Sequence, residues 1–190
     1  MATEEPKYRV EKDYGEFEVR LYAPVIVAET EVTGEFGKVS NEGFRRLAGY
    51  IFGGNDGGRK IAMTAPVGTE PPRKTAAGTK IDMTAPVGAQ PKGEGWVVSF
   101  TMPSQWTMKS LPVPDDDRIR LREVPARRIA AVRFSGTWGP EKFEAIAAQL
   151  REQLEKQGLV PADAPPVYAR YNPPWTPWFL RRNEVLVPLR

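Results

Sequence analysis

A nine-residue segment that occurs twice carries the most distinctive side chains of the sequence. Residues 60–68 read KIAMTAPVG and residues 80–88 read KIDMTAPVG, so eight of nine positions are identical at a spacing of 20. Side chains alternate between the faces of a strand, which places Ile61 beside Met63 and gives Met83 the matching position in the second copy. The two thioethers could line an apolar binding surface, or fill gaps in the core, a common role of methionine.

A predicted helix just before the first copy supplies a second set of candidates. Its apolar residues recur at i, i+3, i+4 and i+7, the spacing of one stripe along a helix: Phe44, Leu47, Ala48 and Ile51. The stripe could form one wall of a binding pocket, or pack against a sheet as core. Three nearby cations could pair with carboxylates of a ligand, or remain solvated: Arg45, Arg46 and Lys60.

Two residue types that most often carry catalysis or bind metals are absent. The chain has no Cys and no His, which excludes disulfides, thiolate nucleophiles, zinc fingers, Ser-His-Asp triads and histidine-ligated haem. Carboxylate chemistry and non-covalent binding remain open. Asp115, Asp116 and Asp117 could hold a hard cation such as Ca²⁺, but adjacent acids without a spaced ligand set are expected to face solvent.

Strands and two helices are predicted around these candidates. Alternating or β-branched apolar residues indicate strands over 17–22, 25–32, 60–67, 80–87, 96–102, 118–124, 127–134, 167–171 and 184–189. Helical spacing indicates helices near 36–52 and 139–157, each followed by a glycine that can end it. Residues 68–79 are expected to form a loop.

The segment near the C-terminus is rich in proline and aromatic residues. Tyr171, Trp175, Trp178 and Phe179 could cap a cleft or face a partner, although packing across the end of the sheet is the simpler interpretation. In the run RRNE at residues 181–184, the two arginines could form a basic lip, although a local ion pair of little energetic worth is the simpler interpretation.

The order of these segments occurs twice. A strand, a proline turn, a second strand, a glycine, a helix and further strands follow one another from Arg20 and again from Arg120. We therefore predict an antiparallel sheet built from two halves, at about residues 8–90 and 94–190, related by an approximate two-fold axis. Chance is the alternative interpretation, since many α+β proteins share a β-β-α-β order.

Composition favours one globular domain with no nucleic-acid partner and no membrane span. Of 190 residues, 41% are hydrophobic and 27% are charged, which is enough apolar material for a core. The net charge of +3 comes from well-mixed charges rather than from a basic cluster. No apolar run approaches the roughly 20 residues of a membrane-spanning helix. No secretory signal is recognisable, so we expect a cytoplasmic protein.

Several motifs, in order along the chain, resemble those of the SOUL/haem-binding protein family. The repeated KIAMTAPV segment is the most recognisable, and EVRLYAP at residues 18–24 resembles the family's N-terminal E-x-R-x-Y-x-P strand. Further family motifs are resembled by residues 44–51, 53–55, 100–103, 171–177 and 181–185. The resemblance extends from about residue 8 to residue 187.

The resemblance implies both a fold and an activity. The fold is α+β: a distorted antiparallel β-barrel from two pseudo-symmetric halves, each with one helix, in a single domain over residues 1–190. The activity is non-covalent binding of haem or a related tetrapyrrole in an apolar cleft by the first helix, for transport or buffering, without enzymatic chemistry. The site would then consist of the apolar and cationic candidates named above, with Met63 and then Met83 as weak iron ligands.

One position departs from the family pattern. Some members have a histidine within the E-x-R-x-Y-x-P strand that has been proposed as the iron ligand, and this chain has Leu21 there. Haem would then be held by apolar contacts, by Arg or Lys with its propionates, or by weak ligands such as Met or Tyr. Two alternatives follow: a small-molecule or protein-interaction module that has lost haem binding, and a hydrolase that uses a Glu and a Tyr in the same cleft.

Overall fold

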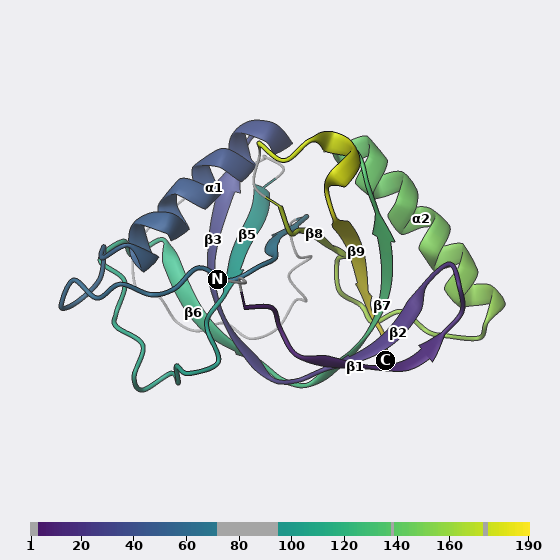
Figure 1. The fold of residues 1–190 in the computed structure, drawn as a ribbon, viewed down its shortest axis with the longest axis horizontal. Coiled ribbons are helices and arrows are strands. Elements are labelled where there is room, and N and C mark those ends of the chain that lie inside the picture. The colour runs from purple at the N-terminus through teal and green to yellow at the C-terminus, as the bar shows by residue number, and fades with distance from the viewer. Residues whose placement is uncertain (1–3, 72–94, 138, 173–174) are drawn as a thin grey trace, which may run out of the picture.

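Nine strands and two long helices make up the described part of the chain, which comprises residues 4–71, 95–137, 139–172 and 175–190 of a computed structural model (Figure 1). The strands are β1 (Tyr8–Asp13), β2 (Glu18–Tyr22), β3 (Val25–Thr33), β4 (Val67–Glu70), β5 (Gly95–Thr101), β6 (Ile119–Val124), β7 (Arg127–Phe134), β8 (Val167–Arg170) and β9 (Asn183–Pro188). The helices are α1 (Phe36–Ile51), α2 (Pro140–Lys156) and a short 3-10 helix, η1 (Trp178–Leu180). None of these helices is both long and apolar enough to cross a membrane.

The strands form one antiparallel sheet with a symmetric order. That order is β1-β2-β7-β9-β8-β4-β5-β3-β6. Beyond β1, this order is symmetric. If β2 and β6, β3 and β7, β4 and β8, and β5 and β9 exchange places, the same order results, read from the other end. With β1 set aside, the first strand of each half pairs with the second strand of the other half, β2 with β7 and β6 with β3. This exchange groups β5 with the first half, although the predicted division at about residues 90–94 assigns it to the second; a common origin of the halves stays a prediction.

The sheet curls into a half-barrel, and the two helices cover its outer face, one on each arm (Figure 1). Helix α1 packs on β3 and β5, and α2 packs on β7 and β9. The predicted α+β class and the distorted-barrel architecture are confirmed.

Three hydrophobic clusters hold the sheet and helices together. Under α1, Leu47 packs with Val98 of β5. Under α2, Phe143 and Leu150 pack with Val185 of β9. Because side chains alternate along each strand, a third cluster that contains no helix residue forms on the concave face: Tyr22, Ile129, Ala131, Val167, Ala169 and Leu186.

Gly43 allows α1 to lie close to the sheet. A Cβ atom at this position would lie only 2.5 Å from Val98 Cγ2, much closer than van der Waals contact. Gly49, on the same helix, has no atom within 4 Å of the place that a Cβ would take. The packing of α1 on β5 therefore requires glycine at position 43 and not at position 49.

The predicted elements differ from the structure at two places. The strand expected over 60–67 begins only at Val67 and continues to Glu70, because Pro66 has no N–H to donate to a neighbouring strand. Strand β1 was not expected, since its six residues are all exposed and it pairs only with β2 at the sheet edge. The second copy of the repeat, residues 80–88, lies outside the described residues.

Candidate functional site

A cleft of about 710 Å³ lies beside the β2–β3 and β6–β7 turns. Segments far apart in the sequence line it: residues 4–7, 23–26, most of 101–107, 123–126, and Thr64. Ile26, Met102 and Trp106 contribute apolar surface. The volume falls within the roughly 300–1,000 Å³ that is usual for small-molecule sites.

A smaller hollow of about 60 Å³ continues the cleft into the concave face of the sheet. It also reaches Tyr22 and Tyr171, which belong to a buried polar cluster. The hollow adjoins the cleft, because five residues line both: Pro6, Ala23, Val25, Thr101 and Val124.

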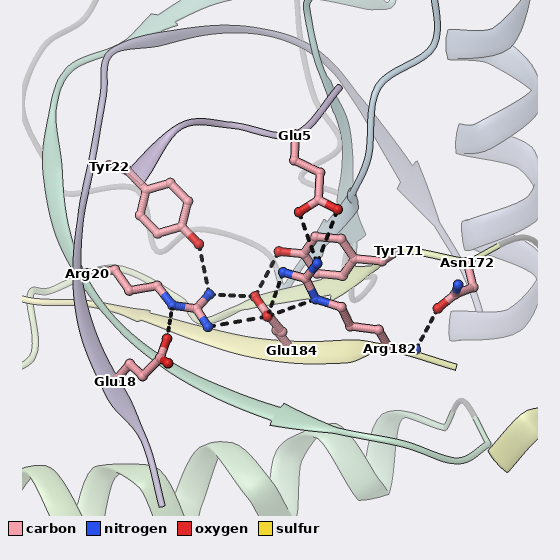
Figure 2. Close-up of polar contacts among 8 residues, drawn as sticks. All are labelled: Glu5, Glu18, Arg20, Tyr22, Tyr171, Asn172, Arg182 and Glu184. Carbon is pink, nitrogen blue, oxygen red and sulfur yellow. Dashed lines mark hydrogen bonds and ion pairs between the residues drawn. The ribbon is translucent and has the colours of Figure 1, made fainter. Parts of the chain in front are cut away.

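Figure 2 shows the polar cluster, whose Tyr22 and Tyr171 also pack in or against the apolar cluster of the concave face. At the centre of the polar cluster is Glu184 of β9, which is fully buried. Arg20 Nη1 and the Tyr171 hydroxyl each donate to Glu184 Oε2 at 2.8 Å. Arg182 Nη2 donates to Glu184 Oε1 at 3.0 Å. Two guanidinium groups and one hydroxyl therefore offset the cost of burying this charge.

Two further carboxylates complete the cluster (Figure 2). Glu18 accepts a hydrogen bond from Arg20 Nε at 2.6 Å, and Glu5 accepts one from Arg182 Nη1 at 3.0 Å. Arg20 Nη1 also donates to the Tyr22 hydroxyl at 3.2 Å. Glu18, Arg20 and Tyr22 alternate along β2, which brings all three to the concave face.

The surroundings of Glu184 and Tyr171 shift the pKa values of both groups away from neutral pH. Burial by itself raises the pKa of Glu184, but hydrogen bonds and charges from Arg20, Tyr171 and Arg182 bring that pKa below its usual value. Burial and the adjacent Glu184 carboxylate raise the pKa of the Tyr171 hydroxyl far above its usual value. At neutral pH Glu184 is ionised and Tyr171 is neutral, and neither is poised to exchange a proton.

Residues 4–7, which we call the strap, connect the two halves at the cleft. The Glu4 carbonyl accepts a hydrogen bond from Ala65 N at 2.9 Å, and its carboxylate accepts one from Ser104 N at 3.0 Å. The next residue, Glu5, reaches Arg182 on the other half. All four strap residues line the cleft.

The structure places the apolar candidates of the sequence in different surroundings. Leu47, Ile51 and Ile61 are buried in the core under α1. Phe44 is exposed, with its ring edge-on to Phe100, and Ala48 is half-buried on the same helix. These three buried residues therefore pack as core and do not form a pocket wall.

The cationic and methionine candidates are also dispersed. Arg45 and Lys60 are exposed. Arg46 already has partners within the chain, since it donates hydrogen bonds to Thr30 Oγ1 at 2.7 Å and to Glu42 at 2.6 Å. Met63 is exposed, and Met83 lies outside the described residues. None of the nine described candidates lines the cleft or the hollow, and their role in ligand binding stays a prediction.

The C-terminal aromatic residues do not pack across the end of the sheet as expected. Tyr171 joins the polar cluster, whereas Trp175, Trp178 and Phe179 are exposed. They lie in the loop between β8 and β9, where Trp178 accepts a backbone hydrogen bond from Gly136. The expected local ion pair within residues 181–184 does form, between Arg182 and Glu184 at 3.0 Å, but its Glu184 end is fully buried on the concave face rather than exposed.

The acidic run at residues 115–117 has one carboxylate that is already paired. Arg118 donates hydrogen bonds to Asp116, and these hold the pKa of that carboxyl at about 2. Within the described ranges, no group of three or more His, Cys, Asp or Glu side chains is arranged to hold a metal ion.

Sequence reasoning missed the strap and the Glu184 cluster. A signal for the cluster was present, because Arg20 stands between Val19 and Leu21, and Glu184 precedes Val185 in an apolar strand. Charged side chains in such positions are rarely buried without a partner. No comparable signal marks the strap, whose polar residues look like an ordinary chain end.

Fold and site together define a class: an α+β half-barrel of two matching halves, with an apolar cleft between a chain end and the turns. The sequence model of a family described as SOUL heme-binding protein matches residues 3–188. The chain therefore belongs to the SOUL heme-binding protein family. Heme-binding protein 1 of Xenopus laevis is 30% identical over 176 residues, which are 92% of this chain and 84% of the relative.

Solved structures share the fold at low sequence identity. An uncharacterized conserved protein from Listeria innocua superposes with a TM-score of 0.64 at 11% identity, over 92% of both chains. A hydrolase from the same organism superposes with a TM-score of 0.58 at 10% identity, over 92% of both chains. Identities this low establish likeness of fold alone.

Proposed function

We propose that this protein binds haem or a related tetrapyrrole non-covalently in the 710 Å³ cleft, and that it transports or buffers this ligand. The observation that carries the proposal is an apolar cleft of ligand size in a chain of the SOUL heme-binding protein family. The relative from Xenopus laevis is itself named for heme binding. A cytoplasmic location and the absence of a nucleic-acid partner stay predictions.

The side chains in the cleft suit a planar apolar ring. Ile26 and Met102 offer apolar contact, and Lys7 offers positive charge for a propionate. Trp106 lines the same cleft, and its indole Nε1–H is buried without a hydrogen-bond partner in the described part of the chain. Apolar burial contributes about 25 cal/mol per Å² before association costs, so contact with the ring should dominate affinity.

Strong axial ligation of an iron is not part of the proposal. The chain has neither His nor Cys. Met102 lines the cleft and Met63 does not, which makes Met102 the better candidate for a weak thioether contact. Bound ferric haem should therefore show neither a bis-histidine nor a thiolate spectrum.

The proposal assigns no catalytic step to the cleft. The meeting of Glu184 and Tyr171 is the arrangement that would favour the hydrolase alternative. The pKa of Glu184, however, is below its usual value and that of Tyr171 is far above its usual value, so at neutral pH Glu184 is a weak base and Tyr171 a weak acid. The other alternative, a module that has lost haem binding, is favoured by the missing histidine.

Hemin titration of the purified apoprotein, followed at the Soret band, tests the proposal. Ala126 and Ala148 form a matched pair, since both are exposed but only Ala126 lines the cleft. We expect Ala126→Asp to weaken hemin binding by roughly tenfold, about 1.4 kcal/mol, and Ala148→Asp to leave it unchanged. A flat titration of the wild-type protein would select the module that has lost haem binding. Equal affinities of the two variants would place the site elsewhere.

A further inference from the structure

We propose that Arg182 is the subsite for a carboxylate group of the ligand, and that Glu5 occupies this subsite while the cleft is empty. The inference rests on the proposed tetrapyrrole function and assigns one ligand group to one side chain. The class of ligand that it selects is a planar apolar molecule with at least one free carboxylate.

The guanidinium of Arg182 has two edges with different partners. Its Nε and Nη2 donate to Glu184 Oε1 at 3.2 and 3.0 Å. Its Nη1 donates to both oxygens of Glu5, at 3.1 and 3.0 Å. Glu184 is fully buried, whereas the Glu5 side chain is 40% exposed. The first partner is therefore permanent, and the second can leave into water.

Tyr171 keeps Arg182 in place whether or not Glu5 is bound. The guanidinium carbon lies 3.8 Å from the centre of the Tyr171 ring, a close cation–π contact. Glu184 holds the other edge. Departure of Glu5 would thus leave a preorganised donor group rather than a flexible side chain, and a fixed guanidinium edge is well suited to bind a carboxylate.

The position of Glu5 connects this subsite with the cleft. Glu5 lines the cleft, and its carboxylate faces the guanidinium of Arg182 (Figure 2), which is not itself a lining residue. The other contacts of the strap do not involve Arg182: Glu4 is bound to Ala65 and Ser104, and the Lys7 carbonyl accepts a hydrogen bond from Ala23 N. Glu5 can therefore release Arg182 without loss of the other strap contacts.

Charge explains why the exchange favours an acidic ligand. Two guanidinium groups, Arg20 and Arg182, pair with three carboxylates, Glu184, Glu18 and Glu5, which gives the cluster one negative charge in excess. Replacing the Glu5 carboxylate by a ligand carboxylate leaves this balance unchanged. An esterified ligand has no charge to offer Arg182, so it would leave Glu5 in place on the Nη1 edge.

The test compares hemin with hemin dimethyl ester on three proteins: wild type, Glu5→Gln and Glu11→Gln. Glu11 makes a similar exposed ion pair with Arg128 at 2.8 Å, away from the cleft, and serves as the matched control. We expect Glu5→Gln to bind hemin between about twofold and fivefold more tightly, the range of an exposed ion pair. The ester should bind Glu5→Gln and wild type equally, and Glu11→Gln should behave as wild type. No gain for hemin, or an equal gain for the ester, would overturn the proposal.

A probe without the tetrapyrrole separates this inference from the proposed function. Sodium propionate is titrated into Glu5→Gln while the Arg182 side-chain Nε–H signal is followed by nuclear magnetic resonance. We expect that signal to shift in Glu5→Gln and to stay in place in wild type at the same propionate concentration. A shift with propionate and no binding of hemin would overturn the tetrapyrrole function alone. An unmoved Arg182 signal in Glu5→Gln would overturn the carboxylate subsite, even if hemin binds.

Discussion

The hydroxyl of Tyr171 donates a 2.8 Å hydrogen bond to Glu184, a carboxylate without solvent exposure on the neighbouring strand. Taken alone, this pair has the geometry of an acid–base couple. Arg20 and Arg182 change its chemistry, because they stabilise the ionised Glu184, while burial keeps Tyr171 protonated. The pair is therefore best understood as a structural anion with a fixed hydrogen-bond donor.

Glu184→Gln should destabilise the protein strongly. The substitution leaves two buried guanidinium groups with a neutral partner, and breaking a buried ion pair on one side costs about 3–5 kcal/mol. Glu18 binds the same Arg20 from a position that is 34% exposed, so Glu18→Gln should cost about 0–1 kcal/mol. Urea unfolding of both variants measures the difference. Similar losses in the two variants would contradict a central role of Glu184.

Stability should fall in acid because of Glu184. Its pKa in the folded protein is depressed below the value of about 4.3 in an unfolded chain. The stabilisation is therefore complete above about pH 4.3 and is lost as the pH falls through the folded pKa. The free energy of unfolding, measured in urea from pH 7 downward, should drop less steeply in Glu184→Gln than in wild type. Parallel pH profiles would show that the carboxylate is not preferentially ionised in the folded state.

Two glycines on α1 should respond oppositely to alanine. Gly43→Ala places a methyl group 2.5 Å from Val98 Cγ2, and such overpacking costs about 1–3 kcal/mol. Gly49→Ala meets no atom within 4 Å and should stabilise the helix by up to about 1 kcal/mol. Thermal unfolding of the two variants gives the signs directly. Stabilisation by both would mean that α1 lies farther from β5.

Leu47→Ala should lower the stability of the protein without changing its affinity for hemin. Leu47 is buried under α1, and removal of its side chain costs about 2–5 kcal/mol. At a temperature where the variant remains folded by circular dichroism, its hemin affinity should equal that of wild type, because Leu47 does not line the cleft. A tenfold loss of affinity in the folded variant would move the site to α1.

The sequence predicted the helices and most strands well, because their signals are local. Apolar spacing and a following glycine placed α1 and α2 within one residue at each end. Position 66 shows the limit of that approach. A proline interrupts the alternating pattern there, and β4 begins only at Val67. Strand β1 carries no buried face, and its pairing with β2 is not encoded in alternation.

The site was harder to predict, because spacing reveals which residues share a face but not what that face meets. Leu47 and Ile51 do share a stripe, and the sheet covers them. The cleft is formed by a chain end, two turns and a loop that meet only in the folded protein. The motifs that contain Arg20, Tyr171 and Glu184 were recognised, yet their convergence depends on strand order.

The exchange of first strands between the halves has a consequence for folding kinetics. Tyr22 pairs with Arg127, and Val25 pairs with Val124, so both exchanged pairings join residues about a hundred positions apart. Loops of this length must close before the contacts can form, which raises the contact order and slows folding. Neither half holds a complete set of pairing partners. We therefore expect each half, expressed alone, to stay unfolded, and the two together to fold at a rate that depends on their concentrations.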